Sequence, residues 1–303
     1  MGSDIHVIVV GGSPRLLETA REFIEDLEDR WSRFRPNSEI SRMNAVAGFP
    51  ARVSATTLAL VQRALEGARV TGGRYDPTVL GAVLRAGYDR SFEQLTGDPP
   101  RASSHLGLGY GEIEIDLARS TVTLPWGVGF DPGGIGKGYA ADLLVDELLA
   151  RGAVGACANV GGDLRVAGSP QGESWVIDID HPMGGRPAAT VSLRSGAVAT
   201  SSRMRRTWGP KDDRRHHLID PSTGVPAKGN VASATVVAAE AWEAEVAAKA
   251  AFIAGAHLGV GLLESLRTDG LLINLRGSQH RTSGFDRFAV RGAADQVLEE
   301  AAR

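Results

Sequence analysis

The sequence predicts an α+β fold with mixed, largely antiparallel sheets and packed helices. Three observations support this prediction: apolar residues recur at helical spacing in several segments, short apolar runs have strand character, and the two kinds of segment come in mixed order rather than in strict β-α alternation. With 303 residues, of which 43% are apolar, the chain has ample material for a core. We expect a single domain over residues 1–303 that has two lobes, with the loop-rich stretch 86–111 as the junction between them.

Five segments have the apolar periodicity of helices. They cover residues 15–31, 58–68, 139–149, 241–254 and 257–267. Gly72 and Gly152 follow the second and third of these segments, and glycine is typical just after a helix end. Strand candidates are shorter and rich in β-branched residues, and they cover 5–10, 113–117, 121–125, 176–179, 190–193, 232–238 and 271–275. The turn-like residues 118–120 predict a hairpin between the second and third strands.

Composition excludes several classes of protein. The net charge is −3 and no basic stripe stands out, so nucleic acid is not an expected partner. A single cysteine, Cys157, excludes an intrachain disulfide. No window approaches 18 apolar residues, so we expect no membrane span. The apolar run 5–10 is too short for a secretory signal, and we therefore expect a cytoplasmic protein, with an exported form that has lost a leader as the alternative.

A glycine-rich segment, DPGGIGKGY at 131–139, directly precedes a predicted helix. Backbone amides at a helix start favour an anion, and Lys137 adds a positive charge, so the segment is a candidate phosphate cradle. It is not a P-loop, because Gly138 stands where that motif needs a hydroxyl. It is not the dinucleotide fingerprint either, because Tyr139 stands where that motif needs glycine. The alternative is a tight glycine turn that only enters a helix.

Six motifs in this order and spacing resemble those of the ApbE-type FAD:protein FMN transferases. They are SRFRPNSEISRMN (32–44), GGRYDPTV (72–79), DPGGIGKGY (131–139), NVGGDL (159–164), ATSS (199–202) and HLIDPSTG (217–224). The resemblance runs from about residue 1 to residue 284. It implies an α+β protein with FAD in a cleft between lobes and a divalent cation, usually Mg²⁺. It also implies that FMN is transferred from FAD to a Thr hydroxyl of an acceptor flavoprotein through a phosphoester bond, with release of AMP.

The resemblance also implies roles for individual residues. The implied cofactor-binding residues are Ser38, Glu39, Ser41, Asn44, Tyr75, Asp76, Thr78, Gly133, Gly134, Lys137, Asn159, Gly161, Gly162, Asp163, Thr200 and Ser201. Lys137, His217 and Asp220 are implied catalytic residues, and His217 is the candidate base for the acceptor hydroxyl. A backbone carbonyl of the glycine segment, at Gly134, is an implied metal ligand.

One segment departs from the family pattern. AEVAAKA at 244–250 aligns with Ala-Asp-Ala-x-Ala-Thr-Ala, whose Asp and Thr ligate the metal, but Glu245 and Lys249 stand at those positions. A charged Lys has only donors and cannot ligate a cation. Three interpretations follow. Glu245 and Lys249 form a salt bridge on a helix face, or the Lys249 ammonium replaces the cation and holds the pyrophosphate, or Mg²⁺ still binds through Glu245 with Lys249 turned aside.

The predicted function is therefore FAD:protein FMN transfer, with two alternatives that Lys249 keeps open. These are an FAD-binding protein with weak or no transferase activity, and an FAD pyrophosphatase in which water replaces the Thr hydroxyl. Individual residues also have structural interpretations. Asp76 can cap a helix start with Pro77 at its first position, residues 159–163 can form a plain glycine turn between strands, and His217 can be a surface histidine.

Overall fold

The computed structural model describes residues 4–95, 107–170, 172–210 and 214–290. Part of the predicted lobe junction, residues 96–106, lies outside the described residues. Within the described chain, seven strands form one antiparallel sheet in the order β1-β5-β6-β9-β14-β15-β16. Their bounds are β1 (Ile5–Val10), β5 (Gly155–Val160), β6 (Asp163–Gly168), β9 (Gly196–Ser202), β14 (Val231–Ala238), β15 (Asp269–Asn274) and β16 (Gln279–Arg281).

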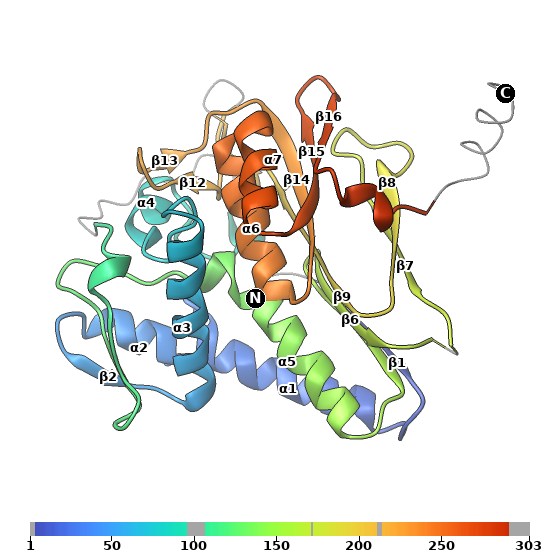
Figure 1. Ribbon diagram of the computed structural model, residues 1–303. Helices are drawn as coiled ribbons and strands as arrows, with labels where there is room; N and C mark the ends of the chain where they lie inside the picture. Colours follow the sequence, from blue (N-terminus) through green and yellow to red (C-terminus); the bar gives the residue numbers. More distant parts are fainter. Residues whose placement is uncertain (1–3, 96–106, 171, 211–213, 291–303) are drawn as a thin grey trace, which may run out of the picture.

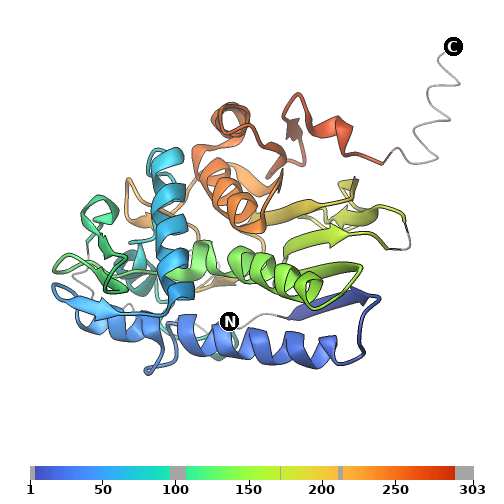
Figure 2. The ribbon, with the colours of Figure 1, turned by 60° about the horizontal axis from the view of Figure 1, so that its bottom comes forward.

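Three helices cover one face of this sheet: α5 (Gly136–Ala150), α6 (Ala241–Ala254) and α7 (Ala256–Ser265) (Figure 1). The long helix α1 (Leu16–Trp31) packs against α5 and also contacts the edge strand β1 (Figure 2). Close packing of α5 on α6 requires glycine at Gly138, because a Cβ there would overlap the carbonyl of Ala241. The first turn of α5 is thereby fixed beside α6, and both carry residues of the candidate site.

The opposite face of the sheet packs against a hairpin of β7 (Trp175–Ile179) and β8 (Ala189–Leu193). Successive side chains of the central strands point to opposite faces of the sheet and so contribute to the hydrophobic core on each face. In β5, Ala156 and Ala158 belong to the core under the helices, whereas Cys157 belongs to the core under the hairpin. Strands buried on both faces therefore show a continuous apolar run rather than alternation in the sequence.

The remaining elements of the described chain are three α-helices, a small sheet and two short strand pairs. The helices are α2 (Glu39–Ala45), α3 (Ala55–Val70) and α4 (Leu80–Arg85). A small antiparallel sheet has the order β2-β4-β3, from β2 (Pro50–Arg52), β4 (Thr121–Thr123) and β3 (Glu114–Asp116). Two further short ladders pair β10 (Thr207–Trp208) with β11 (Arg215–His216) and β12 (Ile219–Asp220) with β13 (Val225–Pro226).

The predicted α+β class with a largely antiparallel sheet is confirmed. Each of the five predicted helices and seven predicted strands overlaps an element of the same kind, and the hairpin β3–β4 pairs as expected. The sequence did not predict the helices α2 and α4 or the strands β2, β5, β6, β9, β10, β11, β12, β13 and β16. Among the described residues, no helix combines the length and apolar character needed to cross a bilayer.

Candidate active site

Two cavities meet beside the first turn of α5. The first has an aromatic wall, and we call it the aromatic cavity; its ring residues are Trp31, Phe34, Tyr75 and Tyr88. The second is the polar cavity, whose lining includes Asn159, Asp178, Asp180, Thr200, Ser202 and Ser233. Lys137, Arg206 and His217 line both cavities. A ligand that extends from one cavity into the other must therefore pass these three side chains.

The glycine-rich segment folds as the 3-10 turn η3 (Pro132–Gly134) and then enters α5. Asp131 initiates the turn, because its carboxylate accepts the Gly133 N–H at 3.0 Å. The prediction of a tight glycine turn at a helix start is thus confirmed, whereas anion binding by this segment remains a prediction. Gly133, Gly134 and Lys137 all line the aromatic cavity, so the turn does present its backbone to a ligand.

Lys137 lies between two buried carboxylates. Its Nζ donates to Glu245 Oε1 at 2.7 Å and also contacts Asp163. The second oxygen of Glu245 accepts the Gly138 N–H at 2.8 Å, so both Glu245 oxygens have donors. Burial alone would lower the pKa of Lys137, but the two carboxylates raise it above its usual value. Burial raises the pKa of Asp163 to about 6, even though the Lys137 ammonium acts to lower it.

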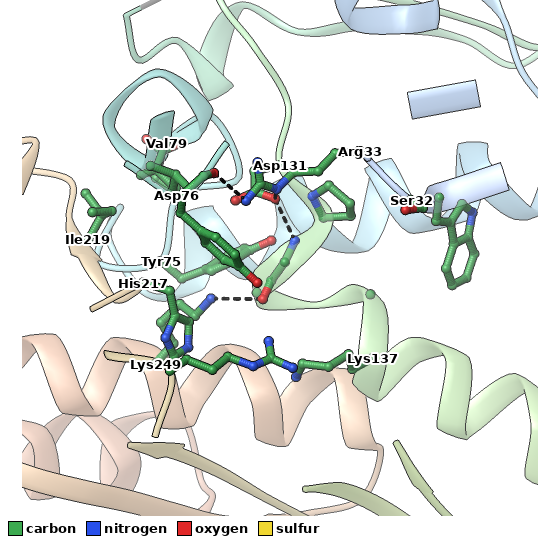
Figure 3. Close-up of a pocket in the computed structure, with 18 of the residues that line it drawn as sticks. Ser32, Arg33, Tyr75, Asp76, Val79, Asp131, Lys137, His217, Ile219 and Lys249 are labelled. Carbon is green, nitrogen blue, oxygen red and sulfur yellow. Dashed lines mark hydrogen bonds and ion pairs between the residues drawn. The ribbon is translucent and has the colours of Figure 1, made fainter. Parts of the chain in front are cut away.

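Lys249 projects from α6 into the glycine turn, one helical turn after Glu245. Its Nζ donates to the Gly133 carbonyl at 3.3 Å (Figure 3). The absence of a side chain at Gly134 makes room for it, because a Cβ there would overlap the Lys249 ammonium and approach the Tyr75 ring to 2.9 Å. Burial lowers the pKa of Lys249, and the carboxylate of Glu245 opposes this shift.

These contacts decide between interpretations of the departure from the family pattern. A Glu245–Lys249 salt bridge on a helix face is wrong, because Glu245 is only 3% exposed and is held by Lys137 and Gly138. Lys249 is not turned aside either, since it lines the aromatic cavity. The interpretation that agrees with the geometry has the ammonium standing at the glycine turn.

His217 borders both cavities and is not a surface histidine. Its Nδ1 is buried and has no hydrogen-bond partner among the described residues. Burial lowers the pKa of His217 well below its usual value, and the charges of Lys249 and Arg206 lower it further. The ring is therefore neutral near pH 7 and can accept a proton. The neighbouring His216 differs, because both of its ring nitrogens bond to the backbone.

Tyr75 also carries an unpaired buried polar atom. Its hydroxyl has no hydrogen-bond partner within the described part of the chain, although the residue is 2% exposed and lines the aromatic cavity. Burial raises the pKa of Tyr75 well above its usual value, and the Glu245 carboxylate adds to this effect. A buried hydroxyl that faces a cavity without a partner is suited to a polar ligand atom. In Figure 3, Tyr75, Asp131, His217 and Lys249 surround a common space.

Several predicted cofactor residues hold the scaffold behind the cavities. Ser38 caps α2, because its side chain accepts the Ser41 N–H at 3.0 Å. Glu39 accepts the Ser54 N–H at 3.0 Å and the Ser54 hydroxyl at 2.8 Å, which ties α2 to the start of α3. Neither cavity is lined by Ser38, Glu39 or Ser41. The structure therefore gives these residues an indirect role rather than a contact position.

Asn44 and Thr78 act in the same indirect way. The Asn44 amide donates to the Phe130 carbonyl at 2.9 Å and accepts the Phe130 N–H at 2.7 Å, which fixes the chain just before Asp131. Asp76 lines the aromatic cavity and accepts the Thr78 N–H at 2.7 Å, which closes a turn. It does not cap a helix with Pro77 at the first position, because α4 begins at Leu80 after the N-cap Val79. Thr78 is fully buried and lines neither cavity.

The polar cavity collects most of the remaining predicted residues. Asn159, Gly161 and Gly162 lie at the β5–β6 hairpin, where the Asn159 side chain accepts the Gly162 N–H at 2.8 Å. The glycine turn between strands is thus confirmed, and it borders the cavity as well. Thr200 and Ser201 point to opposite faces of β9, so only Thr200 lines the cavity and Ser201 is buried.

Asp220 lies at the edge of the site rather than in it. Its carboxylate accepts the Ser222 N–H at 2.9 Å and the Ser222 hydroxyl at 2.6 Å, which shapes the turn after β12. The preceding residue, Ile219, lines the aromatic cavity, whereas Asp220 lines neither cavity. Its predicted catalytic role is therefore not supported by position, and its contacts shape the turn that follows β12.

Among the cavity residues that the sequence did not predict, three carry charge at or near the junction. Arg33 and Asp131 line the aromatic cavity and form an ion pair at 3.6 Å, with both side chains about nine-tenths buried. Arg206 lines both cavities. A signal was present for Arg206, because three of the four residues at 203–206 are arginine and follow the ATSS motif directly. Arg33 and Asp131 lie in two of the quoted motifs, but their pairing was not predictable because they are distant in sequence.

Comparison with known proteins gives this architecture a family. The model of the ApbE family matches residues 1–272. The chain belongs to the ApbE family. It is similar to the FAD:protein FMN transferase of Treponema pallidum, with 31% identity over 82% of this chain and 73% of the relative. It is also similar to the FAD:protein FMN transferase of Vibrio cholerae, with 26% identity over 87% of this chain and 80% of the relative.

Solved structures of the ApbE family share the fold. The ApbE protein of Thermotoga maritima superposes with a TM-score of 0.86 and 30% identity, and the match covers 96% of this chain and 97% of the other. The flavinyl transferase ApbE of Pseudomonas stutzeri superposes with a TM-score of 0.83 at 23% identity, covering 97% and 95% of the two chains. The antiparallel sheet and its helical layer are therefore those of the family.

The residues of this ApbE protein do not fit the divalent cation that the sequence resemblance implies. Mg²⁺ binds oxygen ligands in strict octahedral geometry. Both oxygens of Glu245 already accept hydrogen bonds, and the Lys249 ammonium stands at the glycine turn where the carbonyl ligand would lie. Among the described residues, no group of three or more His, Cys, Asp or Glu side chains is placed to hold a metal ion.

Proposed function

We propose that this chain is an FAD:protein FMN transferase, which moves FMN from FAD to a Thr hydroxyl of an acceptor flavoprotein and releases AMP. One observation carries the proposal: Lys137, Arg206 and His217 line both cavities, so cationic groups and a neutral base meet at one junction. The relatives from Treponema pallidum and Vibrio cholerae, which carry the name FAD:protein FMN transferase, support it.

FAD has the shape that the two cavities require. It carries two ring systems joined through a diphosphate. The aromatic cavity offers a stacking surface for a planar ring, and the polar cavity offers hydrogen-bonding groups. A diphosphate at the junction would meet the charges of Lys137, Arg206 and Lys249, and charge-assisted bonds to phosphate are among the stronger contacts in proteins.

The reaction balances with groups that the chain supplies. The Thr oxygen of the acceptor attacks the phosphorus on the FMN side of the diphosphate and forms the new phosphoester bond. The bond from that phosphorus to the bridging oxygen breaks, and AMP leaves with that oxygen. The proton of the Thr hydroxyl passes to the neutral ring of His217, while cations at the junction stabilise the charge that develops on the phosphate oxygens.

Transfer of flavin label tests this proposal. The protein is incubated with FAD and an acceptor domain that carries a target Thr, and the products are resolved by in-gel flavin fluorescence and by chromatography for AMP. We expect labelled acceptor and one AMP per label, and no label with a Thr→Ala acceptor. His217→Gln should lose transfer, whereas His257→Gln, an exposed histidine on α7, should retain it.

The two alternative functions are outcomes of the same assay. AMP without labelled acceptor would indicate an FAD pyrophosphatase and would contradict the transferase proposal. FAD binding without either product would indicate an FAD-binding protein of weak or no transferase activity. Absence of FAD binding by folded protein would exclude all three functions.

A further inference from the structure

We infer that the Lys249 ammonium takes the place of a divalent cation at the diphosphate, so that this protein binds FAD without a metal ion. This inference rests on the proposed function, because it concerns how the same site holds FAD. Its basis is the position of one charged side chain relative to the glycine turn and to the other cations of the aromatic cavity.

Two other cationic side chains of the aromatic cavity, Arg33 and Lys137, form ion pairs within the protein. Arg33 faces the Asp131 carboxylate at 3.6 Å. Lys137 lies between Asp163 and Glu245 and serves two negative charges with one positive charge. Lys249 instead donates to an uncharged carbonyl. Its charge is therefore one that a bound anion can use without breaking an ion pair.

The packing of α6 against the glycine turn determines where the Lys249 ammonium lies. The side chain is half-buried on α6, and the bare backbone of Gly134 leaves the space that its ammonium fills. Its Nζ contacts the Gly133 carbonyl at the point where the chain turns into α5. The ammonium thus lies against the glycine turn, which lines the same cavity as Lys137.

A metal ion would have to displace this arrangement. An ammonium has only donors and cannot ligate a cation, and like charges in a half-buried site repel. A metal ion at Glu245 would compete with the Lys137 ammonium for Oε1 or with the Gly138 N–H for Oε2. A diphosphate, in contrast, offers oxygens that accept hydrogen bonds from the ammonium. The site consequently favours the anion alone over the anion with a dication.

Titration calorimetry with FAD tests the inference. Wild-type protein is first treated with a chelator to remove metal ions and is then titrated with FAD, once in EDTA and once in millimolar Mg²⁺. We expect the two dissociation constants to agree within about threefold, which corresponds to less than about 1 kcal/mol in binding free energy. Lys249→Met, which keeps the length of the stem, should weaken binding in EDTA by roughly tenfold to hundredfold, as expected for a lost charge-assisted bond.

Two further variants complete the design. Lys249→Thr should weaken FAD binding in EDTA and should make it respond to Mg²⁺, because the dication no longer meets the ammonium. Lys228→Thr changes the net charge equally at an exposed position that lines neither cavity of the site, and it should bind FAD as wild type does. Circular dichroism confirms that each variant is folded.

The results separate the inference from the proposed function. Wild-type binding that weakens tenfold or more in EDTA would overturn the inference, and so would Lys249 variants that bind and respond to Mg²⁺ as wild type does. FAD binding without labelled acceptor, in both EDTA and Mg²⁺, would overturn the transferase function and leave the inference standing. No FAD binding in any condition would overturn both.

Discussion

The Lys137 ammonium lies 2.7 Å from Glu245 Oε1 and thereby ties the first turn of α5 to the middle of α6. Glu245 closes a second link to the same turn through the Gly138 N–H. A carboxylate at a helix N-terminus is favoured by the helix dipole, so the contact stabilises α5 as well as the ion pair. The cavity wall is consequently held in place before any ligand arrives.

Removing the charge of Lys137 should be costly. Lys137→Met leaves the carboxylates of Asp163 and Glu245 buried at 2% and 3% exposure with no ammonium between them. Breaking a buried ion pair from one side typically costs about 3–5 kcal/mol, and we expect a loss of this size in the free energy of unfolding. Urea denaturation at neutral pH measures it.

A double variant separates charge from packing at this position. Adding Asp163→Asn to Lys137→Met removes one uncompensated charge and should recover part of the lost stability, whereas FAD binding should stay weak. If Lys137→Met unfolds at the same urea concentration as wild type, the buried network does not stabilise the fold as argued.

Asn44 should contribute to FAD binding without touching FAD. Its side chain makes two hydrogen bonds to the Phe130 backbone, and Asn44→Ala loses both. We expect a loss of about 1–3 kcal/mol in the free energy of unfolding, because two backbone groups lose their partner. FAD affinity should fall as well, since Phe130 precedes the glycine turn. Asn44→Asp keeps the acceptor and should lie between Ala and wild type; an Asn44→Ala variant of wild-type stability would show that the clamp is dispensable.

The sequence predicted those features that depend on local pattern. The buried residues of α1 lie three or four positions apart, and this spacing identifies the helix without any tertiary information; they are Leu16, Ala20, Ile24, Leu27 and Trp31. The central strands β5 and β9 were not predicted, because they are buried on both faces and rich in small residues. Their identity as strands comes from pairing with distant segments, which periodicity alone does not reveal.

The same limit applies to the candidate site. The motifs containing Lys137 and His217 were visible in the sequence, and both residues line the junction of the cavities. The partner of Lys137 was not, because Glu245 is 108 residues away and meets it only once α5 packs on α6. The contact of Lys249 with the glycine turn spans 116 residues, and the sequence left its role open among three interpretations.

His216 should make stability depend on pH. Burial lowers the pKa of His216 to about 4, with Arg203 adding to the effect, whereas an unfolded histidine titrates near about 6.5. Between these values the unfolded chain binds the proton more tightly. The free energy of unfolding should therefore fall as the pH drops from about 6.5 to about 4, by up to roughly 3 kcal/mol.

Denaturation at a series of pH values checks this expectation. His216→Gln can still donate to the backbone but does not titrate, so its stability should fall less than that of wild type over the same window. Buried carboxyl groups such as Asp163 and Asp142 contribute to both proteins, so the difference between them isolates His216. Parallel curves for the two proteins would assign the pH dependence to other groups.

His217 should act as a base under acidic conditions where an ordinary histidine would fail. Burial, together with the charges of Lys249 and Arg206, holds its pKa well below the usual value, so the ring stays neutral as the pH falls through 6.5. The single-turnover rate of acceptor labelling should therefore show no inflection near 6.5 and should decline only at lower pH. Measurement between about pH 5 and pH 8, at saturating FAD, locates that decline.

His217→Gln shows whether the pH profile belongs to this ring. Loss of a general base typically lowers the rate by about 10²–10⁴-fold, and we expect a loss of this size with FAD affinity nearly unchanged. The decline at low pH should disappear in the variant, because no titrating base remains at that position. A decline that persists in His217→Gln would place the base elsewhere, and an inflection near 6.5 in wild type would mean that the ring is more exposed to water during turnover than its burial implies.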